Sequence, residues 1–350
     1  MKALAFLLLT CAAAVAAGWA GMRPQPSYPS AGIIHSEAGA LDRLIVPGTV
    51  IERLADGFQW SEGPVWIDDP GFLLLSDVPA NRMYRWSEGE GLSVFLEPSG
   101  YAGTEKGIFR EPGSNGLIRG DGNSILLADH GNRAVARLDL GTRAKTFLAT
   151  RFNGKRFNSP NDLVRASDGS TYFTDPPYGL EGLDKSPHKE LAFNGVYRLL
   201  PTGEVELVDD RLTFPNGVVL SPDERTLYVA VSDPYRAHIY AYALDEDGRP
   251  AARRLFADMT ELARGGLPGL PDGMAVDVEG NLYATGPGGV HVFNPEGVRL
   301  GRIDTGTAVA NCAFGEDGRT LFLASNDFLA RVRTRVAGLG ADSAARRSER

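Results

Sequence analysis

Cysteine and histidine are scarce in this 350-residue sequence, which has two cysteines and five histidines. The histidines are scattered, and neither an H-x-x-E-H nor a C-x-x-C spacing occurs, which argues against a conventional zinc site. We expect the segment that contains Cys11 to be removed, which would leave only Cys312 and no intramolecular disulfide. A single cysteine within an apolar run is usually a buried small side chain, and we expect this of Cys312.

The sequence also lacks an excess of basic residues, helical periodicity and a long apolar run. The formal net charge of −8 at pH 7 argues against binding to a nucleic-acid backbone and suits a cation site. Residues 259–264 are the single short candidate for a helix. The apolar stretch at 3–17 is shorter than the about 20 residues that a membrane span needs, so we expect no membrane span.

The N-terminus has the pattern of a secretory signal peptide over residues 1–20: a basic start, a short apolar region and small residues at 14–16 and 18–20. This predicts an exported protein, periplasmic or secreted. A lipid anchor on Cys11 is the alternative, although Thr10 fits such processing poorly. Residues 21–40, rich in Pro, Ser, Gly and Ala, are expected to form a flexible leader, and residues 338–350 a disordered tail.

One short phrase occurs six times in the chain. Each copy places an oxygen-bearing side chain ahead of a short apolar run, and Asp77, Asp129 and Asp175 follow at the end of the second run in three of the repeats. A spacing of roughly 40–55 residues is typical of a repeat architecture with four strands per propeller blade. The copies are SEGPVW at 61–66, SNGLI at 114–118, PNDLV at 160–164, PNGVV at 215–219, PDGMA at 271–275 and ANCAF at 310–314.

Apolar runs of four to eight residues, separated by Gly, Pro, Asp and Asn, predict short strands and tight turns throughout. We therefore expect an all-β fold, a single six-bladed β-propeller over residues 41–337. In the first blade the strands would be 64–67, 71–75, 82–86 and 92–96. Residues 49–54 have no earlier blade to join, so they should pair with the last blade and close the ring, which removes exposed strand edges.

If the six phrases begin the innermost strands, their polar side chains converge on the axis at one face. Glu62, Asn161, Asn216 and Asp272 could then supply four oxygens and two negative charges, the ligands that hard cations prefer. The alternative is that Asn-Gly and Asp-Gly are simply turn pairs that a repeat fold reuses. Glu62 is a poor turn residue. Burying these four side chains around the axis is also costly unless a cation or hydrogen-bond donors satisfy their oxygens, so a ring of metal ligands is favoured.

Two long insertions, 98–113 and 176–194, are expected at the same face, where they would form a lid or a substrate wall. His130 falls on a connection there and is interpreted either as a turn residue or as a donor beside the ring. Arg133, Asp175 and Tyr178 occupy comparable places, as loop structure or as substrate contacts.

These motifs resemble the SMP-30/gluconolactonase/luciferin-regenerating family, in particular its bacterial gluconolactonase-like branch, over essentially all of residues 50–335. The family is a six-bladed propeller. The resemblance implies that Glu62, Asn216 and Asp272 bind a divalent metal and that Asn161 is a fourth ligand or a substrate contact. It also implies that Asp272 is the catalytic base, or a nucleophile as in phosphotriesterase-like relatives. Animal members have an arginine where this chain has Ser159, so their substrate preference does not transfer.

The implied reaction is hydrolysis of a sugar lactone, with one divalent metal ion polarising the ester carbonyl and Asp272 accepting the proton of water. Asn115, Asn161, His130 and Tyr178 would contact the substrate. Ca²⁺ is the expected metal, with Zn²⁺, Mg²⁺ and Mn²⁺ as alternatives, and we expect a monomer, with a dimer as the alternative. Two other functions stay open: an esterase or phosphotriesterase on the same site, and a non-catalytic calcium-binding scaffold.

Overall fold

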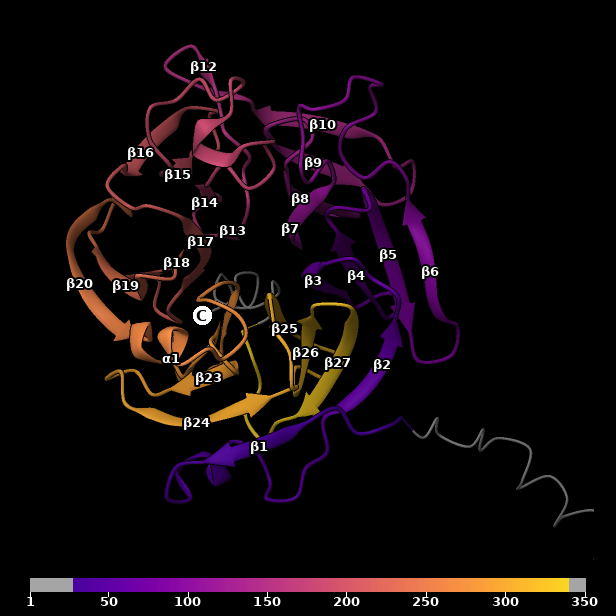
Figure 1. Cartoon of the computed structure of the whole chain (residues 1–350), viewed down its shortest axis with the longest axis vertical. Helices are drawn as coiled ribbons and strands as arrows, with labels where there is room; N and C mark the ends of the chain where they lie inside the picture. The colour runs from indigo at the N-terminus through magenta and orange to yellow at the C-terminus, as the bar shows by residue number, and fades with distance from the viewer. Residues whose placement is uncertain (1–27, 340–350) are drawn as a thin grey trace, which may run out of the picture.

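Each of the six phrases leads into the innermost strand of an antiparallel sheet of four or five strands, and the six sheets surround one axis (Figure 1). This computed structural model describes residues 28–339, and it confirms the expected six-bladed β-propeller. Each inner strand contacts the next around the axis, and the inner strand of the last blade contacts that of the first. Among residues 28–339, no helix has the length and apolar character that crossing a membrane requires.

The first three blades follow one another in chain order, each running from the axis outward. Blade one comprises β3 (Ser61–Ile67), β4 (Phe72–Asp77), β5 (Arg82–Ser87) and β6 (Gly91–Leu96). Blade two comprises β7 (Ser114–Arg119), β8 (Ser124–Asp129), β9 (Ala134–Asp139) and β10 (Lys145–Ala149). Blade three comprises β13 (Leu163–Arg165), β14 (Thr171–Asp175), β15 (Gly195–Leu199) and β16 (Val205–Asp209).

The last three blades complete the circle. Blade four comprises β17 (Pro215–Leu220), β18 (Thr226–Asp233), β19 (Arg236–Leu244) and β20 (Pro250–Asp258). Blade five comprises β21 (Met274–Val276), β22 (Leu282–Gly286), β23 (Gly289–Phe293) and β24 (Arg299–Asp304). Blade six comprises β25 (Asn311–Gly315), β26 (Thr320–Ser325), β27 (Phe328–Arg333) and the N-terminal β2 (Glu52–Asp56).

The N-terminal part of the described chain closes the ring. β2 pairs antiparallel with β27, as expected for residues 49–54, so blade six contains strands from both ends of the fold. The expected flexible leader needs correction, because its residues Ile33–Ser36 form β1, a fifth strand that pairs with β24. Backbone hydrogen bonds along β24 hold these residues, despite their position in a Pro- and Gly-rich stretch. The signal at 1–20, the leader up to residue 27 and the tail from 340 lie outside the described residues.

The loops of the described chain contain a short helix, two 3-10 turns and a small hairpin. The expected helix is present as α1 (Thr260–Arg264), and 3-10 turns occupy η1 (Ala40–Arg43) and η2 (Leu183–Lys185). A small hairpin of β11 (Arg151–Phe152) and β12 (Lys155–Arg156) links blades two and three. At the C-terminal end, Leu339 donates its backbone N–H to Val276 O at 2.9 Å, so the first residues of the expected tail still contact blade five.

Apolar layers between neighbouring blades hold the sheets together. Trp66 of blade one stacks on Phe322 of blade six, with ring centroids 5.6 Å apart, and Leu73 and Leu75 pack in the same layer. Cys312 is buried within the layer between blades five and six, as expected of a small apolar side chain. Each fully buried Leu or Phe contributes about 1.5–3 kcal/mol relative to its exposed form, so these layers fix the blades that carry the axial side chains.

Hydroxyl groups on the second strands of blades one, three and four join each of these blades to the next near the axis. Ser76 donates to the backbone oxygen of Asn115 at 2.8 Å, and Thr174 donates to that of Asn216 at 2.6 Å. Ser232 makes the equivalent bond to Pro271 O at 2.6 Å. Each hydroxyl therefore fixes the backbone that presents the polar side chain of the following blade.

The acids that close the second strands hold the chain segments that enter the inner strands. Asp77 accepts the N–H groups of Gln59 and Trp60 at 3.0 and 3.2 Å. Asp175 accepts those of Asn158 and Ser159, both at 2.8 Å. Asp175 is thus loop structure rather than a substrate contact.

Arg133 is also loop structure. This buried side chain donates from Nε to the backbone oxygens of Phe157 and Asn158 at 2.6 and 3.1 Å. The Arg133 side chain therefore holds the segment ahead of the third axial phrase, and both expected alternatives for Arg133 and Asp175 are decided in favour of structure.

Candidate functional site

The six axial phrases place their polar side chains together at one end of the propeller axis. Glu62, Asn115, Asn161 and Asn216 are each only 2–3% exposed, whereas Asp272 is half-buried. The four metal ligands that the sequence predicted therefore come from four different blades. Asn311 of the sixth phrase donates from Nδ2 to Glu62 Oε2 at 3.2 Å, so its amide holds Glu62 in place.

The glycines that follow these side chains are required by close packing at the axis. Asn115-Gly116 and Asn216-Gly217 lie within β7 and β17, so the interpretation of these pairs as turns is wrong. A Cβ on Gly217 would lie 2.0 Å from Asp272 O, and one on Gly116 would lie 2.6 Å from Asp162 Oδ1. Only glycine lets neighbouring inner strands approach this closely, which brings the side chains of adjacent blades together.

Three carboxyl groups share this buried region. Burial, followed by the charge of Asp162, raises the pKa of Glu62 to about 8. Burial also raises the pKa of Asp162 to about 7. The pKa of Asp272 lies well above its ordinary value because of burial and then the charge of Glu62. Within residues 28–339 these groups are crowded by one another and not neutralised by a basic side chain, so the site favours protons or a cation.

Two asparagines direct unsatisfied oxygens into the site. Asn216 Nδ2 donates to Ser232 Oγ at 2.9 Å, and because the Ser232 hydrogen goes to Pro271 O, the amide orientation is fixed. The Oδ1 atoms of Asn216 and Asn115 have no hydrogen-bond partner in the described part of the chain. A buried polar atom without a partner costs roughly 1–3 kcal/mol, so these oxygens are expected to meet a ligand.

The donor set fits a hard divalent cation. Carboxylate and amide oxygens are the ligands of Ca²⁺ and Mg²⁺, and the unsatisfied Asn216 oxygen together with the carboxyl groups of Glu62 and Asp272 offers this chemistry. Residues 28–339 contain no cluster of three His, Cys, Asp or Glu side chains able to hold a metal. A metal here would thus depend on the asparagine oxygens. Asn161 is positioned by its backbone, which accepts from Gly116 N and donates to Thr174 O, each at 2.8 Å.

His130 lies beside Asn115, as the sequence suggested. Its side chain is fully buried, and burial lowers its pKa to about 3, so the imidazole is neutral. Its Nε2 lies 3.4 Å from Asn115 Nδ2, and its Nδ1 lies 3.6 Å from Glu111 Oε2. His130 is therefore a neutral ring that contacts a candidate substrate ligand.

Tyr178 belongs to the wall of the site. Its ring stacks on Phe214 at 5.7 Å, and its hydroxyl donates to Ser232 O at 3.5 Å. Asp272 and burial both raise the Tyr178 pKa, burial being the larger cause, which places this phenol near the candidate base. Its half-buried ring is available to a substrate.

The two long insertions join over this end of the axis. Arg110 N donates to Gly179 O at 3.0 Å, and Glu181 N donates to Ile108 O at 2.9 Å, so 98–113 and 176–194 form one cover. Ser159 is buried and donates to Pro176 O at 2.6 Å. It therefore supports the second insertion instead of reaching a substrate.

Sequence reasoning missed Glu111, Asp162 and Ser232. Glu111 is buried, burial raises its pKa to about 7, and its charge contributes to the raised pKa of Asp272. It lies in a non-repeated insertion, so no pattern marked it. Asp162 did stand inside the third phrase, where the other phrases place glycine or cysteine, and that difference was a usable signal.

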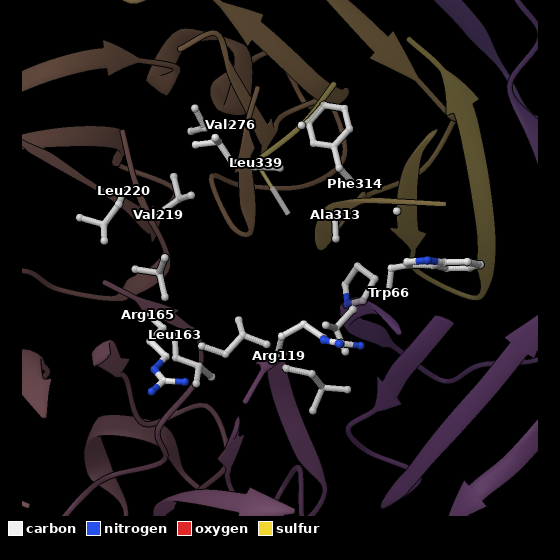
Figure 2. A pocket seen from close by; sticks show the side chains of 18 of the residues that line it. Trp66, Arg119, Leu163, Arg165, Val219, Leu220, Val276, Ala313, Phe314 and Leu339 are labelled. Atoms are coloured by element: carbon white, nitrogen blue, oxygen red, sulfur yellow. The ribbon is translucent and has the colours of Figure 1, made fainter. Parts of the chain in front are cut away.

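The opposite end of the axis holds a cavity of about 1190 Å³. Leu163, Val219 and Val276 are among the aliphatic side chains around it, with Arg119 and Arg165 also on its wall (Figure 2). Arg165 forms an exposed ion pair with Asp121 at 2.6 Å. Asp162 and Asn311 also line this cavity, so it reaches residues that act on Glu62 and Asp272, although Glu62, Asp272 and the asparagines with unsatisfied oxygens are not part of its wall.

The chain was compared with known proteins. Residues 60–327 match the model of the SMP-30/gluconolactonase/LRE-like region. A gluconolactonase of Zymomonas mobilis is 48% identical over 302 residues, covering 85% of each chain. The pentonolactonase XacC of Haloferax volcanii is 29% identical, covering 76% of this chain and 81% of that protein. A solved gluconolactonase structure from Xanthomonas campestris superposes with a TM-score of 0.75 at 32% identity, covering 89% and 99% of the two chains.

Proposed function

This chain belongs to the SMP-30/gluconolactonase/LRE-like family, and from that premise we propose that it hydrolyses a sugar lactone, with Asp272 as general base beside a bound divalent cation. The relatives whose names specify lactones support the reaction class. The observation that carries the assignment is the buried group of carboxyl and unsatisfied amide oxygens at one end of the axis, in which Asp272 alone is half-buried.

The ring would hold the cation through Glu62, Asn161, Asn216 and Asp272. Such a cation, when bound, acts as a Lewis acid toward an ester carbonyl. The fit rests on the unsatisfied Asn216 oxygen and on the carboxyl groups of Glu62 and Asp272, which lack a basic partner in the described residues.

Asp272 would take a proton from an attacking water. Without a cation, burial and then the charge of Glu62 raise its pKa well above the ordinary value, and a bound cation would offset part of this rise. Asp272 N donates to Thr285 Oγ1 at 3.1 Å, and Gly273 N donates to Ala310 O at 2.8 Å. Both bonds hold the backbone that carries the carboxylate.

The remaining polar groups would bind the sugar hydroxyls. Asn115 Oδ1 is an unsatisfied acceptor, and Tyr178, stacked on Phe214, offers an aromatic ring in the wall of the site. The joined insertions cover this end and restrict water, which strengthens polar contacts between the site and its substrate. Orientation of the ring hydroxyls would align the ester carbonyl with the base.

The test is acid release from glucono-1,5-lactone by the purified protein, with and without a chelator. We expect turnover above the spontaneous rate, loss of turnover with chelator and recovery when a divalent cation is restored. An organophosphate and a simple aryl ester are assayed in parallel. Turnover of only those two substrates would replace the lactonase proposal with a different ester hydrolase, and bound metal without any turnover would favour a scaffold.

A further inference from the structure

The His130 ring lies between a buried carboxyl group and a buried amide. Its Nδ1 faces Glu111 Oε2 at 3.6 Å, and its Nε2 faces Asn115 Nδ2 at 3.4 Å. Glu111 comes from the insertion 98–113, His130 from the connection between β8 and β9, and Asn115 from β7. Three segments of the chain therefore form a line that ends at the axis.

Glu111 favours a hydrogen on Nδ1 of His130, which lies 3.6 Å from the Glu111 carboxylate and also interacts with the Glu111 backbone. Arg110 Nη2 lies 2.7 Å from Glu111 Oε1 and favours the ionised carboxylate. If Nδ1 of a neutral imidazole carried only a lone pair, it would face a carboxylate oxygen, and two acceptors would repel each other. The hydrogen therefore belongs on Nδ1, and the 3.6 Å separation can tighten when a substrate binds, as such contacts often do.

This tautomer fixes the Asn115 amide. With its hydrogen on Nδ1, His130 has a lone pair on Nε2, which can only accept, so Asn115 must present its NH₂ group to the ring. The Asn115 oxygen is then directed away from His130, and it has no partner among residues 28–339. Ser232 fixes the amide of Asn216 in the same way on the opposite side of the site.

We propose that Glu111 is a positioning residue that, through His130, turns the Asn115 oxygen into the site as an acceptor for a hydroxyl group of the substrate. The inference deepens the proposed lactonase function and rests on it for the substrate class. An acceptor at this place selects lactones that carry ring hydroxyls over unsubstituted lactones, because a buried acceptor left without a donor is costly.

The first readout is the tautomer of His130, observed by ¹H–¹⁵N correlation spectra of ¹⁵N-histidine-labelled protein at pH 8. His291 is an internal reference of the opposite kind, because its Nε2 donates to Pro287 O at 2.9 Å. We expect Nδ1–H on His130 in the wild type and in Glu111→Gln, whose amide oxygen can still accept. In Glu111→Ala we expect loss of the pure Nδ1–H signature, with His291 unchanged.

The second readout is selectivity between glucono-1,5-lactone and δ-valerolactone. Loss of one oriented hydrogen bond predicts that Glu111→Ala lowers the ratio of the two kcat/KM values about tenfold, mainly through KM for the hydroxylated lactone. Glu111→Gln should retain most of the ratio. Glu181→Ala, the same kind of change at an exposed position of the neighbouring insertion, should retain all of it.

The two readouts separate this inference from the proposed function. An unchanged Nδ1–H signature in Glu111→Ala overturns the positioning role, whatever the enzyme hydrolyses. An equal loss of activity on both lactones overturns the selective role, because a general structural defect does not discriminate between them. Absence of lactone turnover in the wild type defeats the proposed function, while a changed tautomer in Glu111→Ala would still support the positioning of Asn115.

Discussion

The two ends of the propeller axis are formed by the same six inner strands, yet their linings are opposite in character. At one end Glu62, Asp272 and the amides of Asn115 and Asn216 meet under two joined insertions, with carboxyl pKa values raised by burial and mutual repulsion. At the other end the cavity of about 1190 Å³ has mostly apolar walls, with Arg119, Arg165 and Asp162 among its charged side chains. The size of a void thus says little about where chemistry occurs, whereas convergent polar groups without partners do.

The largest effect is expected from Asp272→Asn, which removes the base and one negative charge while keeping the shape. Loss of general-base catalysis typically costs 10²–10⁴-fold, so we expect the rate of lactone hydrolysis to fall about 10³-fold. The control is Asp121→Asn, the same change at the opposite end of the axis, where Asp121 pairs with Arg165 on the surface. Comparable losses in both variants would erase the contrast between the two ends.

Ser232→Ala should have the next largest effect. It removes the bond that orients the Asn216 amide, and loss of such a supporting bond typically costs 10–100-fold in metal affinity. We expect calcium affinity, measured by calorimetry on chelator-treated protein, to fall about tenfold. Ser76→Ala removes an equivalent bond between blades, to the backbone of Asn115, which is not a candidate metal ligand. Equal loss of affinity in both variants would show that general loosening, not amide orientation, is responsible.

Glu62→Gln should make the cation-free protein more stable at high pH, and it should reduce the stability that bound calcium adds. Without it, the Glu62 pKa is raised from 4.5 to about 8, so the folded state binds more protons than the unfolded state between these values. Stability of the chelated wild type should consequently fall as pH rises from about 5 to 8. Glu62→Gln should flatten this slope, as followed by thermal unfolding, and should weaken the stabilisation that added calcium gives. If the stability of the chelated wild type instead rose with pH over this range, Glu62 would not be a buried carboxyl group with a raised pKa.

The smallest effect is expected at the opposite end. Ala313 is half-buried on the cavity wall (Figure 2), and Ala313→Leu adds apolar volume where there is space. We expect kcat/KM on glucono-1,5-lactone to stay within about twofold of wild type and the melting temperature within about 2 °C. A large loss of activity in a stably folded variant would mean that this cavity takes part in the reaction.

Much of the fold could be predicted because the repeated phrase occurs once in each blade, so its spacing gives the number and length of the blades. The closing role of residues 49–54 followed from the absence of an earlier blade, and β2 pairs with β27 accordingly. β1 was missed because its neighbourhood is rich in Pro, Ser, Gly and Ala, and its pairing with β24 depends on a strand more than 260 residues away. Local composition does not predict a pairing with a strand so distant in the sequence.

In the site, too, the repeated residues could be predicted and the non-repeated ones could not. Glu62, Asn161, Asn216 and Asp272 stand at equivalent places in the repeat, so their convergence follows once the blades are counted. Glu111 could not be found in this way, because it lies in an insertion that the other blades lack. Nor could sequence alone decide that His130 is neutral, since this depends on its complete burial.

The most direct test of the central claim is the position of a bound cation in crystals soaked with Mn²⁺, located by anomalous diffraction. The account predicts one strong peak among the side-chain oxygens of Glu62, Asn216 and Asp272, and loss of that peak in Glu62→Gln. Absence of a peak at this end of the axis, or a peak only in the opposite cavity, would contradict it.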